Sequence, residues 1–280
     1  GGLWPAEGAL SVPFLNQIAD AGFHWTASSQ GVLKHSAGNQ ALTTIPWQAP
    51  EGTPGDITLF FRNEHLSDLI GFEYANWHGR DAAQHFMTEL KAIHIRDNDA
   101  LIPVFLDGEN AWEYYPYNAW YFFSDLYGTL EKNTAIRTVT LSEAANVHRT
   151  RRIRLPRLTA GSWVFGTLST WLGNPDKNRA WDLLCDVKQC ADRALQGNRL
   201  TADERSAVVQ RLAVCESSDW FWWLGDYNSP QSVACFDSLF RENIKSLYRL
   251  LHLPVPVSLD HPISHGGGAP ESGGTMRRAT

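Results

Sequence analysis

The stretch Ile102–Tyr117 reads IPVFLDGENAWEYYPY and joins an apolar run to two acids and several aromatic residues. Its first residues are β-formers with Pro103 near the start, so we predict one buried strand over residues 102–106. Asp107 and Glu109 follow where that strand would end. In α/β folds, side chains at the carboxyl ends of strands project into the mouth of the sheet, so acids there are candidate catalytic groups. The alternative is that both acids only cap the helix predicted to begin near Pro116.

The composition argues against several classes of partner. The chain has 280 residues and a formal net charge of −6, which gives no basic field suited to nucleic acid or to an anionic membrane surface. No run is long enough for a membrane span, and no signal peptide is recognisable. The four cysteines lack Cys-x-x-Cys spacing and lie in apolar helical surroundings. We therefore expect all four to be buried thiols.

Aromatic residues are the outlier of the composition. The chain contains 12 Trp, 13 Phe and 8 Tyr, and nine aromatic residues lie between Trp112 and Tyr127. Trp and Tyr carry polar tips that usually need a partner, so this density exceeds what a core requires. The apolar face of a pyranose can lie against an aromatic ring while its hydroxyls meet carboxylates and amides. The composition therefore favours a sugar ligand without specifying one.

A second acid follows the first predicted strand. Glu7 lies in a loop between a short strand and a helix predicted to begin near Pro13 and to end at Gly22. The next strands are predicted at Phe23–Thr26 and Ile57–Arg62. This alternation is typical of a β/α barrel or a doubly wound sheet, in which Glu7 would occupy an active-site position. The alternative is a loop acid near the start of a helix.

The rest of the chain changes character near Leu155. Residues 34–55 are polar and are expected to form a loop, whereas Ile136–Leu141 alternates like a strand. The basic cluster from Arg149 to Arg157 is interpreted as a solvated loop. Helices are predicted over residues 163–172, 180–195, 202–223 and 232–253. We expect a partial barrel over residues 1–154, a helical bundle over residues 155–253, and a linker or disordered tail over residues 254–280.

Two carboxylates at strand ends are the minimal machinery for cleaving a glycosidic bond. One acid attacks or stabilises the oxocarbenium-like carbon while the other protonates the departing oxygen. On the residues alone, Glu7 and Asp107 are such a pair. His65, His78 and His85 lack the spacing of a metal-ligand motif, so we expect no metal site.

Three segments resemble successive signature regions of a known family. GLWPAEG (residues 2–8), VFLDGENAWEYYP (104–116) and CESSDWFWWLGD (215–226) are similar to signatures of glycoside hydrolase family 57. Two weaker matches, AGFHWTASSQGVL and LSDLIGFEYANWHGRDAA, lie between them in the order that the family shows. The resemblance implies a retaining enzyme acting on α-glucans, a class that includes α-amylases, amylopullulanases, branching enzymes and 4-α-glucanotransferases.

The resemblance also implies roles for individual residues. Glu7 falls on the position of the catalytic nucleophile and Asp107 on that of the general acid/base. Glu109 would be a supporting or substrate-binding carboxylate. The remaining substrate-binding residues so implied are Trp4, Trp112, Glu216, Asp219 and Trp220. The implied fold is the C-terminal part of an incomplete seven-stranded β/α barrel followed by an α-helical bundle, in agreement with the change of character near Leu155.

The chain departs from the family pattern at several places. The first two signatures would lie upstream of Gly1, so we expect a piece of a longer protein. Ser28-Ser29-Gln30 stands where many relatives have Thr-Asp-Glu, Cys215 and Ser217 flank Glu216 in place of smaller residues, and Tyr227-Asn228 replaces the more common Asp-His. The two proposed catalytic acids are retained. The departures leave the subsite preference open.

The leading hypothesis is a retaining α-glucan hydrolase or transglycosylase. It predicts an α-glucan or oligosaccharide as ligand, no cofactor, no metal, no nucleic-acid or membrane partner, and a cytoplasmic location. Two alternatives remain: a metal-dependent polysaccharide deacetylase on a related barrel, and a non-catalytic glycan-binding or regulatory protein that keeps the aromatic cleft. The sequence does not distinguish hydrolysis from glucan transfer, nor does it indicate linkage, chain length or oligomeric state.

Overall fold

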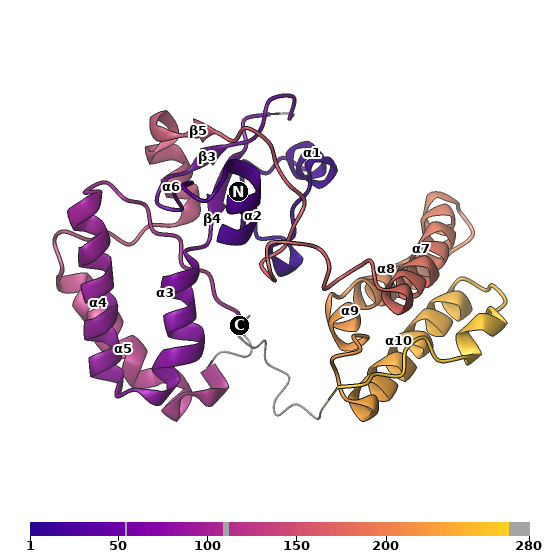
Figure 1. Cartoon of the computed structure of the whole chain (residues 1–280). Helices are drawn as coiled ribbons and strands as arrows, with labels where there is room; N and C mark the ends of the chain where they lie inside the picture. The colour runs from indigo at the N-terminus through magenta and orange to yellow at the C-terminus, as the bar shows by residue number, and fades with distance from the viewer. Residues whose placement is uncertain (54, 109–111, 269–280) are drawn as a thin grey trace. The chain divides into compact units, whose positions relative to one another are not determined.

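The computed structural model describes residues 1–53, 55–108 and 112–268 (Figure 1). The chain divides into two compact units, the first ending at Thr167 and the second beginning at Leu168. The expected boundary at residues 154–155 is therefore too early. Leu155 and Leu158 are buried in a core cluster of the first unit, and Gly161 pairs with Leu10 in an antiparallel bridge.

A five-stranded mixed sheet forms the centre of the first unit, in the order β1-β2-β4-β3-β5. The strands are β1 (Gly2–Leu3), β2 (Trp25–Ser28), β3 (Trp47–Gln48), β4 (Thr58–Phe61) and β5 (Ile153–Arg154). β2 is parallel to β1 and β4, whereas β3 is antiparallel to β4 and parallel to β5. All four residues of β4 are buried, as expected of a strand covered on both faces. The strand predicted at Ile57–Arg62 is confirmed as β4, whereas the strand predicted at Phe23–Thr26 exists as β2 but begins and ends two residues later.

Two predicted strands are not strands. Residues 102–106 are extended but form no regular ladder; their backbone is held by Asn63 N, which donates to Pro103 O at 2.8 Å, and by two side chains described below. A proline has no N–H to give to a ladder, which explains why pairing stops at Pro103. The prediction for Ile136–Leu141 is also wrong, because those residues are irregular until α6 begins. Conversely, residues 34–55, expected to be a loop, contain the end of α2 and strand β3.

The described part of the first unit contains six α-helices. They are α1 (Val12–Asp20), α2 (Gln30–Ala37), α3 (Glu64–Asp68), α4 (Gly79–Arg96), α5 (Trp120–Lys132) and α6 (Leu141–Val147). α4 and α5 run side by side (Figure 1) and share a core cluster that includes Phe86, Leu90, Phe122 and Leu126. The four-residue spacing of these pairs places each pair on one face of its helix.

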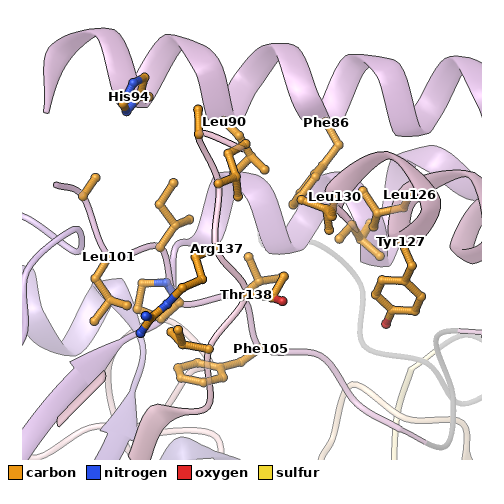
Figure 2. A pocket seen from close by; sticks show the side chains of 18 of the residues that line it. Phe86, Leu90, His94, Leu101, Phe105, Leu126, Tyr127, Leu130, Arg137 and Thr138 are labelled. Atoms are coloured by element: carbon orange, nitrogen blue, oxygen red, sulfur yellow. The ribbon is translucent and has the colours of Figure 1, made fainter. Parts of the chain in front are cut away.

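A cavity of about 470 Å³ lies between α4, α5 and the extended residues 101–106 and 135–141. Figure 2 shows Leu90 of α4, Leu126 of α5 and Phe105 of the extended segment around it. Its walls are mostly apolar. The side chains of Ile102, Val104 and Leu106 pack against the cluster around α4 and α5, so the segment that leads to Asp107 borders both this cluster and the cavity.

The second unit is a helical bundle. Its helices are α7 (Pro175–Gln196), α8 (Ala202–Cys215), α9 (Asp219–Trp223) and α10 (Pro230–Leu250). Residues 163–172 form turns and not the predicted helix, and the helix predicted over residues 202–223 is broken between α8 and α9. The expectation of four buried thiols is also wrong: Cys215 is buried and Cys190 half-buried, but Cys185 and Cys235 are exposed. None of the described helices is both long and apolar enough to cross a membrane.

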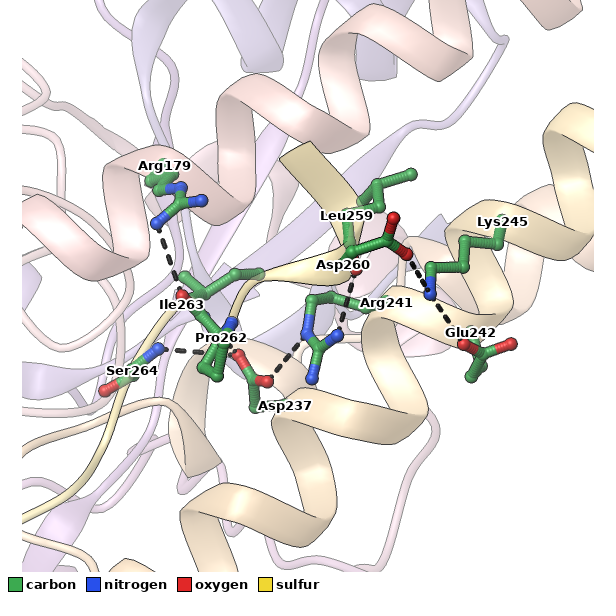
Figure 3. Close-up of polar contacts among 10 residues, drawn as sticks. All are labelled: Arg179, Asp237, Arg241, Glu242, Lys245, Leu259, Asp260, Pro262, Ile263 and Ser264. Atoms are coloured by element: carbon green, nitrogen blue, oxygen red, sulfur yellow. Dashed lines mark hydrogen bonds and ion pairs between the residues drawn. The ribbon is translucent and has the colours of Figure 1, made fainter. Parts of the chain in front are cut away.

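Residues 254–268 pack on the bundle, which corrects the prediction that a linker or disordered tail begins at residue 254. Leu259 and Ile263 are buried, and the buried carboxylate of Asp237 accepts a hydrogen bond from Ile263 N at 2.7 Å. Arg241 pairs with Asp237 at 2.8 Å and donates to Leu259 O at 2.9 Å, as Figure 3 shows. The polar side chains of α10 thus satisfy a backbone segment that has little secondary structure of its own.

The arginine cluster before the second unit is only partly solvated. Arg152, whose side chain is 9% exposed, pairs with Asp56 at 2.8 Å and donates to Thr58 Oγ1 at 3.0 Å. Arg149 also reaches Asp56, at 2.7 Å. The hydrogen bond from Arg152 holds the pKa of Asp56 below its usual range, assisted by the charges of both guanidinium groups. The interpretation of this cluster as a solvated loop is therefore wrong for Arg152.

Candidate active site

Glu7 lies in a tight turn that follows β1. The turn is a 3-10 helix, Ala6–Gly8, in which Glu7 has the left-handed conformation with φ 56° and ψ 20°. A non-glycine residue in this region is uncommon, and such strain is concentrated at functional sites. The turn is fixed at the carboxyl end of β2, because Ser28 Oγ donates to Gly8 O at 2.6 Å. The predicted position of Glu7, after a strand and before a helix, is confirmed.

Trp163 holds Glu7 through two hydrogen bonds. Its indole Nε1 donates to Glu7 Oε2 at 2.8 Å, and its backbone N donates to Glu7 O at 2.9 Å. A bond from an N–H to a carboxylate is charge-assisted and orients the acceptor strongly. Sequence pattern does not indicate this role, because Trp163 is 156 residues from Glu7 and falls within a predicted bundle helix.

Trp4 connects the turn that carries Glu7 to the segment that ends at Asp107. Its ring lies 5.0 Å from the ring of Phe105 and 5.4 Å from that of Trp163, measured between centroids. Glu7 and Asp107 are both half-buried. The structure therefore brings together the two segments that carry the predicted acids, with an aromatic contact between them.

Arg62 is a further residue that the sequence analysis did not select. It directly follows β4, and its side chain is 10% exposed and paired with Asp68 at 2.9 Å. Arg62 Nε donates to Phe105 O at 3.0 Å, and the guanidinium carbon lies 5.8 Å from the centroid of the Trp163 ring. The signal in the sequence that could have indicated Arg62 is its position at the end of a predicted apolar strand.

Two other predicted residues near Asp107 are placed differently. Glu109 lies outside the described residues. Trp112 is half-buried and packs against Phe123 of α5 at 4.7 Å and against Tyr115 at 5.9 Å, so its ring belongs to the cluster around α4 and α5. Its role in substrate binding stays a prediction.

The remaining predicted residues belong to the second unit. Glu216 is exposed where α8 ends, and Asp219 is exposed in the first turn of α9, where it accepts a hydrogen bond from Ser217 Oγ at 3.0 Å. Trp220 is half-buried; its Nε1 donates to Val214 O at 2.7 Å and its ring lies 5.7 Å from Phe240. Their contribution to a substrate cleft stays a prediction.

Tyr227, one of the departures from the family pattern, contacts a buried lysine. Lys177 is 2% exposed, and its Nζ donates to Tyr227 Oη at 3.1 Å and to Thr170 O. Tyr227 in turn donates to Trp222 O at 2.9 Å. Burial lowers the pKa of Lys177 to about 8, against an opposing influence of Asp226.

The histidines named in the sequence analysis are dispersed among other partners. His65 Nε2 contacts Glu89 Oε2 at 3.0 Å, His85 Nδ1 contacts the hydroxyl of Tyr74 at 2.8 Å, and His78 precedes α4. Within residues 1–53, 55–108 and 112–268, no group of three or more His, Cys, Asp or Glu side chains is placed to hold a metal ion.

The segments that carry Glu7 and Asp107 thus lie against each other through the aromatic rings of Trp4 and Phe105, and a pair of carboxylates is what cleavage of a glycosidic bond requires. Residues 1–157 match the family model described as glycosyl hydrolase family 57. Because the match covers more than half of the 280 residues, the chain belongs to that family. No curated protein matches the chain.

Several solved structures share the fold. A GH57-type branching enzyme from the archaeon Pyrococcus horikoshii aligns with TM-score 0.69 and 17% identity over 84% of this chain and 51% of its own. An α-amylase from Thermotoga maritima aligns with TM-score 0.65 and 14% identity over 90% and 59%. A 4-α-glucanotransferase from Thermococcus litoralis aligns with TM-score 0.59 and 14% identity over 89% and 42%. At these identities the likeness shows the fold alone, and the chain spans about half the length of these proteins.

Proposed function

We propose that this chain carries the catalytic acids of a glycoside hydrolase or transglycosylase acting on α-glucans by a retaining mechanism. The observation that carries the proposal is the contact of Trp4 with Phe105 and Trp163, which joins the turn of Glu7 to the segment ending at Asp107. Membership of glycosyl hydrolase family 57 supports the reaction class. The fold likeness to a branching enzyme, an amylase and a glucanotransferase supports an α-glucan as substrate.

The two acids would have different tasks. Glu7 attacks the anomeric carbon and forms a covalent glycosyl-enzyme, while Asp107 donates a proton to the leaving oxygen. In the second step Asp107 removes a proton from water or from a sugar hydroxyl, which attacks the same carbon and releases Glu7. This mechanism requires the two carboxyl groups to lie about 5–5.5 Å apart when the substrate is bound. The indole N–H of Trp163 orients the carboxylate of Glu7 for the attack.

We also propose that the mixed sheet is part of an incomplete seven-stranded β/α barrel, as the resemblance implies. Glu216, Asp219 and Trp220 of the second unit would line the substrate cleft, and the protein would act in the cytoplasm. The choice between hydrolysis and transfer depends on whether water or a sugar hydroxyl reaches the glycosyl-enzyme.

The test is turnover of maltooligosaccharides and starch by the protein and by two isosteric variants. Glu7→Gln and Asp107→Asn should each abolish reducing-sugar release and chain transfer, whereas Glu51→Gln, at an exposed residue, should not. If Glu7 is the nucleophile, azide can restore turnover of Glu7→Gln only by replacing the lost carboxylate. The product would then be a glycosyl azide of inverted configuration. Binding of maltooligosaccharide without any turnover by the unaltered protein would instead indicate a glycan-binding protein.

A further inference from the structure

We propose that Arg62 is a positioning residue that holds both acids of the site in register, an inference that rests on the function proposed above. One guanidinium group reaches the backbone two residues before Asp107 and the indole that binds Glu7. It is buried, with 10% of its side chain exposed, and its charge is paired with Asp68 at 2.9 Å. These contacts make it the common support of two segments that are remote in sequence.

Toward Asp107, Arg62 replaces a missing strand ladder. Its Nε donates to Phe105 O at 3.0 Å, and Ser67 Oγ accepts a hydrogen bond from Phe105 N at 3.3 Å. Residues 102–106 form no strand, and the cavity shown in Figure 2 lies along one side of them. These two hydrogen bonds fix the backbone two residues before Asp107, where no regular ladder does so, while the side chains of Ile102, Val104 and Leu106 pack on the cluster around α4 and α5.

Toward Glu7, Arg62 acts through Trp163. Its guanidinium carbon lies 5.8 Å from the centroid of the indole ring, within the range of a cation–π contact. The edge of the same ring donates to Glu7 Oε2 at 2.8 Å. A cation over the ring face restricts the tilt of the indole, and that tilt sets the direction of the N–H toward Glu7.

The two contacts of Arg62 can be separated by substitution. Lysine keeps a positive charge near the indole and Asp68, but it lacks the planar fork that serves Phe105 O and the ion pair together. Arg62→Lys should therefore disturb Asp107 more than Glu7. Arg62→Leu should disturb both, because it removes the charge as well.

Substrates with different leaving groups report which acid is disturbed. Cleavage between two glucose units needs a proton from Asp107 at the leaving oxygen, whereas an aryl maltoside with a dinitrophenolate leaving group needs little protonic assistance. We expect Arg62→Lys to lower kcat/KM, which reports the step that breaks the glycosidic bond, about tenfold or more on maltooligosaccharides, while kcat/KM on the aryl maltoside changes about threefold or less. Arg62→Leu should lower kcat/KM on both substrates.

Arg241→Lys is the matched control. Arg241 is also a buried arginine that pairs with an aspartate at 2.8 Å and donates to a backbone carbonyl, but it belongs to α10. Its substitution should reduce stability without changing the ratio of the two kcat/KM values. Equal losses on both substrates for Arg62→Lys, or no loss on either, would overturn the inference while the function stands. Absence of any turnover by the unaltered protein would overturn the proposed function itself.

Discussion

Replacing Trp163 by phenylalanine tests how much the orientation of Glu7 contributes to catalysis. The variant keeps an aromatic ring beside Trp4 and keeps the backbone hydrogen bond to Glu7 O, but it removes the indole N–H that lies 2.8 Å from Glu7 Oε2. A hydrogen bond to a charged group contributes about 1.5–3 kcal/mol. If this whole free energy stabilises the transition state, its loss should lower kcat on maltooligosaccharides about 10- to 150-fold.

The assay is steady-state kinetics with a control for stability. We expect the fall in kcat with a KM close to that of the unaltered protein, because the indole contacts the nucleophile and is not assigned to substrate binding. Trp47→Phe is the control: Trp47 is a buried indole of the same unit whose Nε1 donates to Leu42 O at 3.0 Å. A folded Trp163→Phe variant with kcat within about threefold of the unaltered protein, or an equal fall for Trp47→Phe, would refute the assigned role.

Three further substitutions test other parts of the structure. Burial lowers the pKa of Lys177 from 10.5 to about 8, so between these pH values the folded protein binds fewer protons than the unfolded chain. The free energy of unfolding in urea, measured relative to that of Lys177→Met, should therefore rise by about 3 kcal/mol from pH 8 to pH 10.5. A difference between the two proteins that does not change with pH would contradict this. Asp237→Asn leaves a buried guanidinium unpaired and should cost about 3–5 kcal/mol in the same measurement, with faster proteolysis near Ile263; unchanged proteolysis would show that the segment is held otherwise. Gly8→Ala places a Cβ at φ 57° and 2.9 Å from the ring of Trp4. Because this strains the turn that orients Glu7, kcat should fall by more than the loss of stability, measured as the melting temperature, explains. Full activity would contradict a tight turn at Gly8.

The sequence predicted those parts of the fold that depend on local pattern. β4 is a short apolar run, and the helix from Gly79 to Arg96 repeats its apolar residues at helical spacing. The strand predicted over residues 102–106 has the same apolar character, yet it has no ladder. Propensity describes how a residue fits a strand; it does not say whether a neighbouring backbone is in register to pair with it, and Pro103 removes one of the donors.

Residues 254–268 show that local pattern can also miss ordered structure. Residues 254–268 are rich in proline and glycine and lack apolar periodicity, which predicted a disordered linker. Their backbone is satisfied by Asp237 and Arg241, and these side chains come from a different element. Composition indicates whether a segment can form regular structure by its own hydrogen bonds, whereas its order also depends on donors and acceptors that distant residues supply.

In the candidate site, too, sequence pattern indicates some residues and misses others. Glu7 and Asp107 were found because each follows a predicted strand and lies in a recognisable motif. Trp163 and Arg62 were not found, because an indole and a guanidinium have no fixed sequence distance from the acids that they support. A left-handed glutamate costs about 1–3 kcal/mol, and it persists where surrounding contacts over-determine it. Here those contacts are the two bonds from Trp163 and the bond from Ser28 to Gly8 O, so residues from two other segments keep Glu7 oriented before substrate binds.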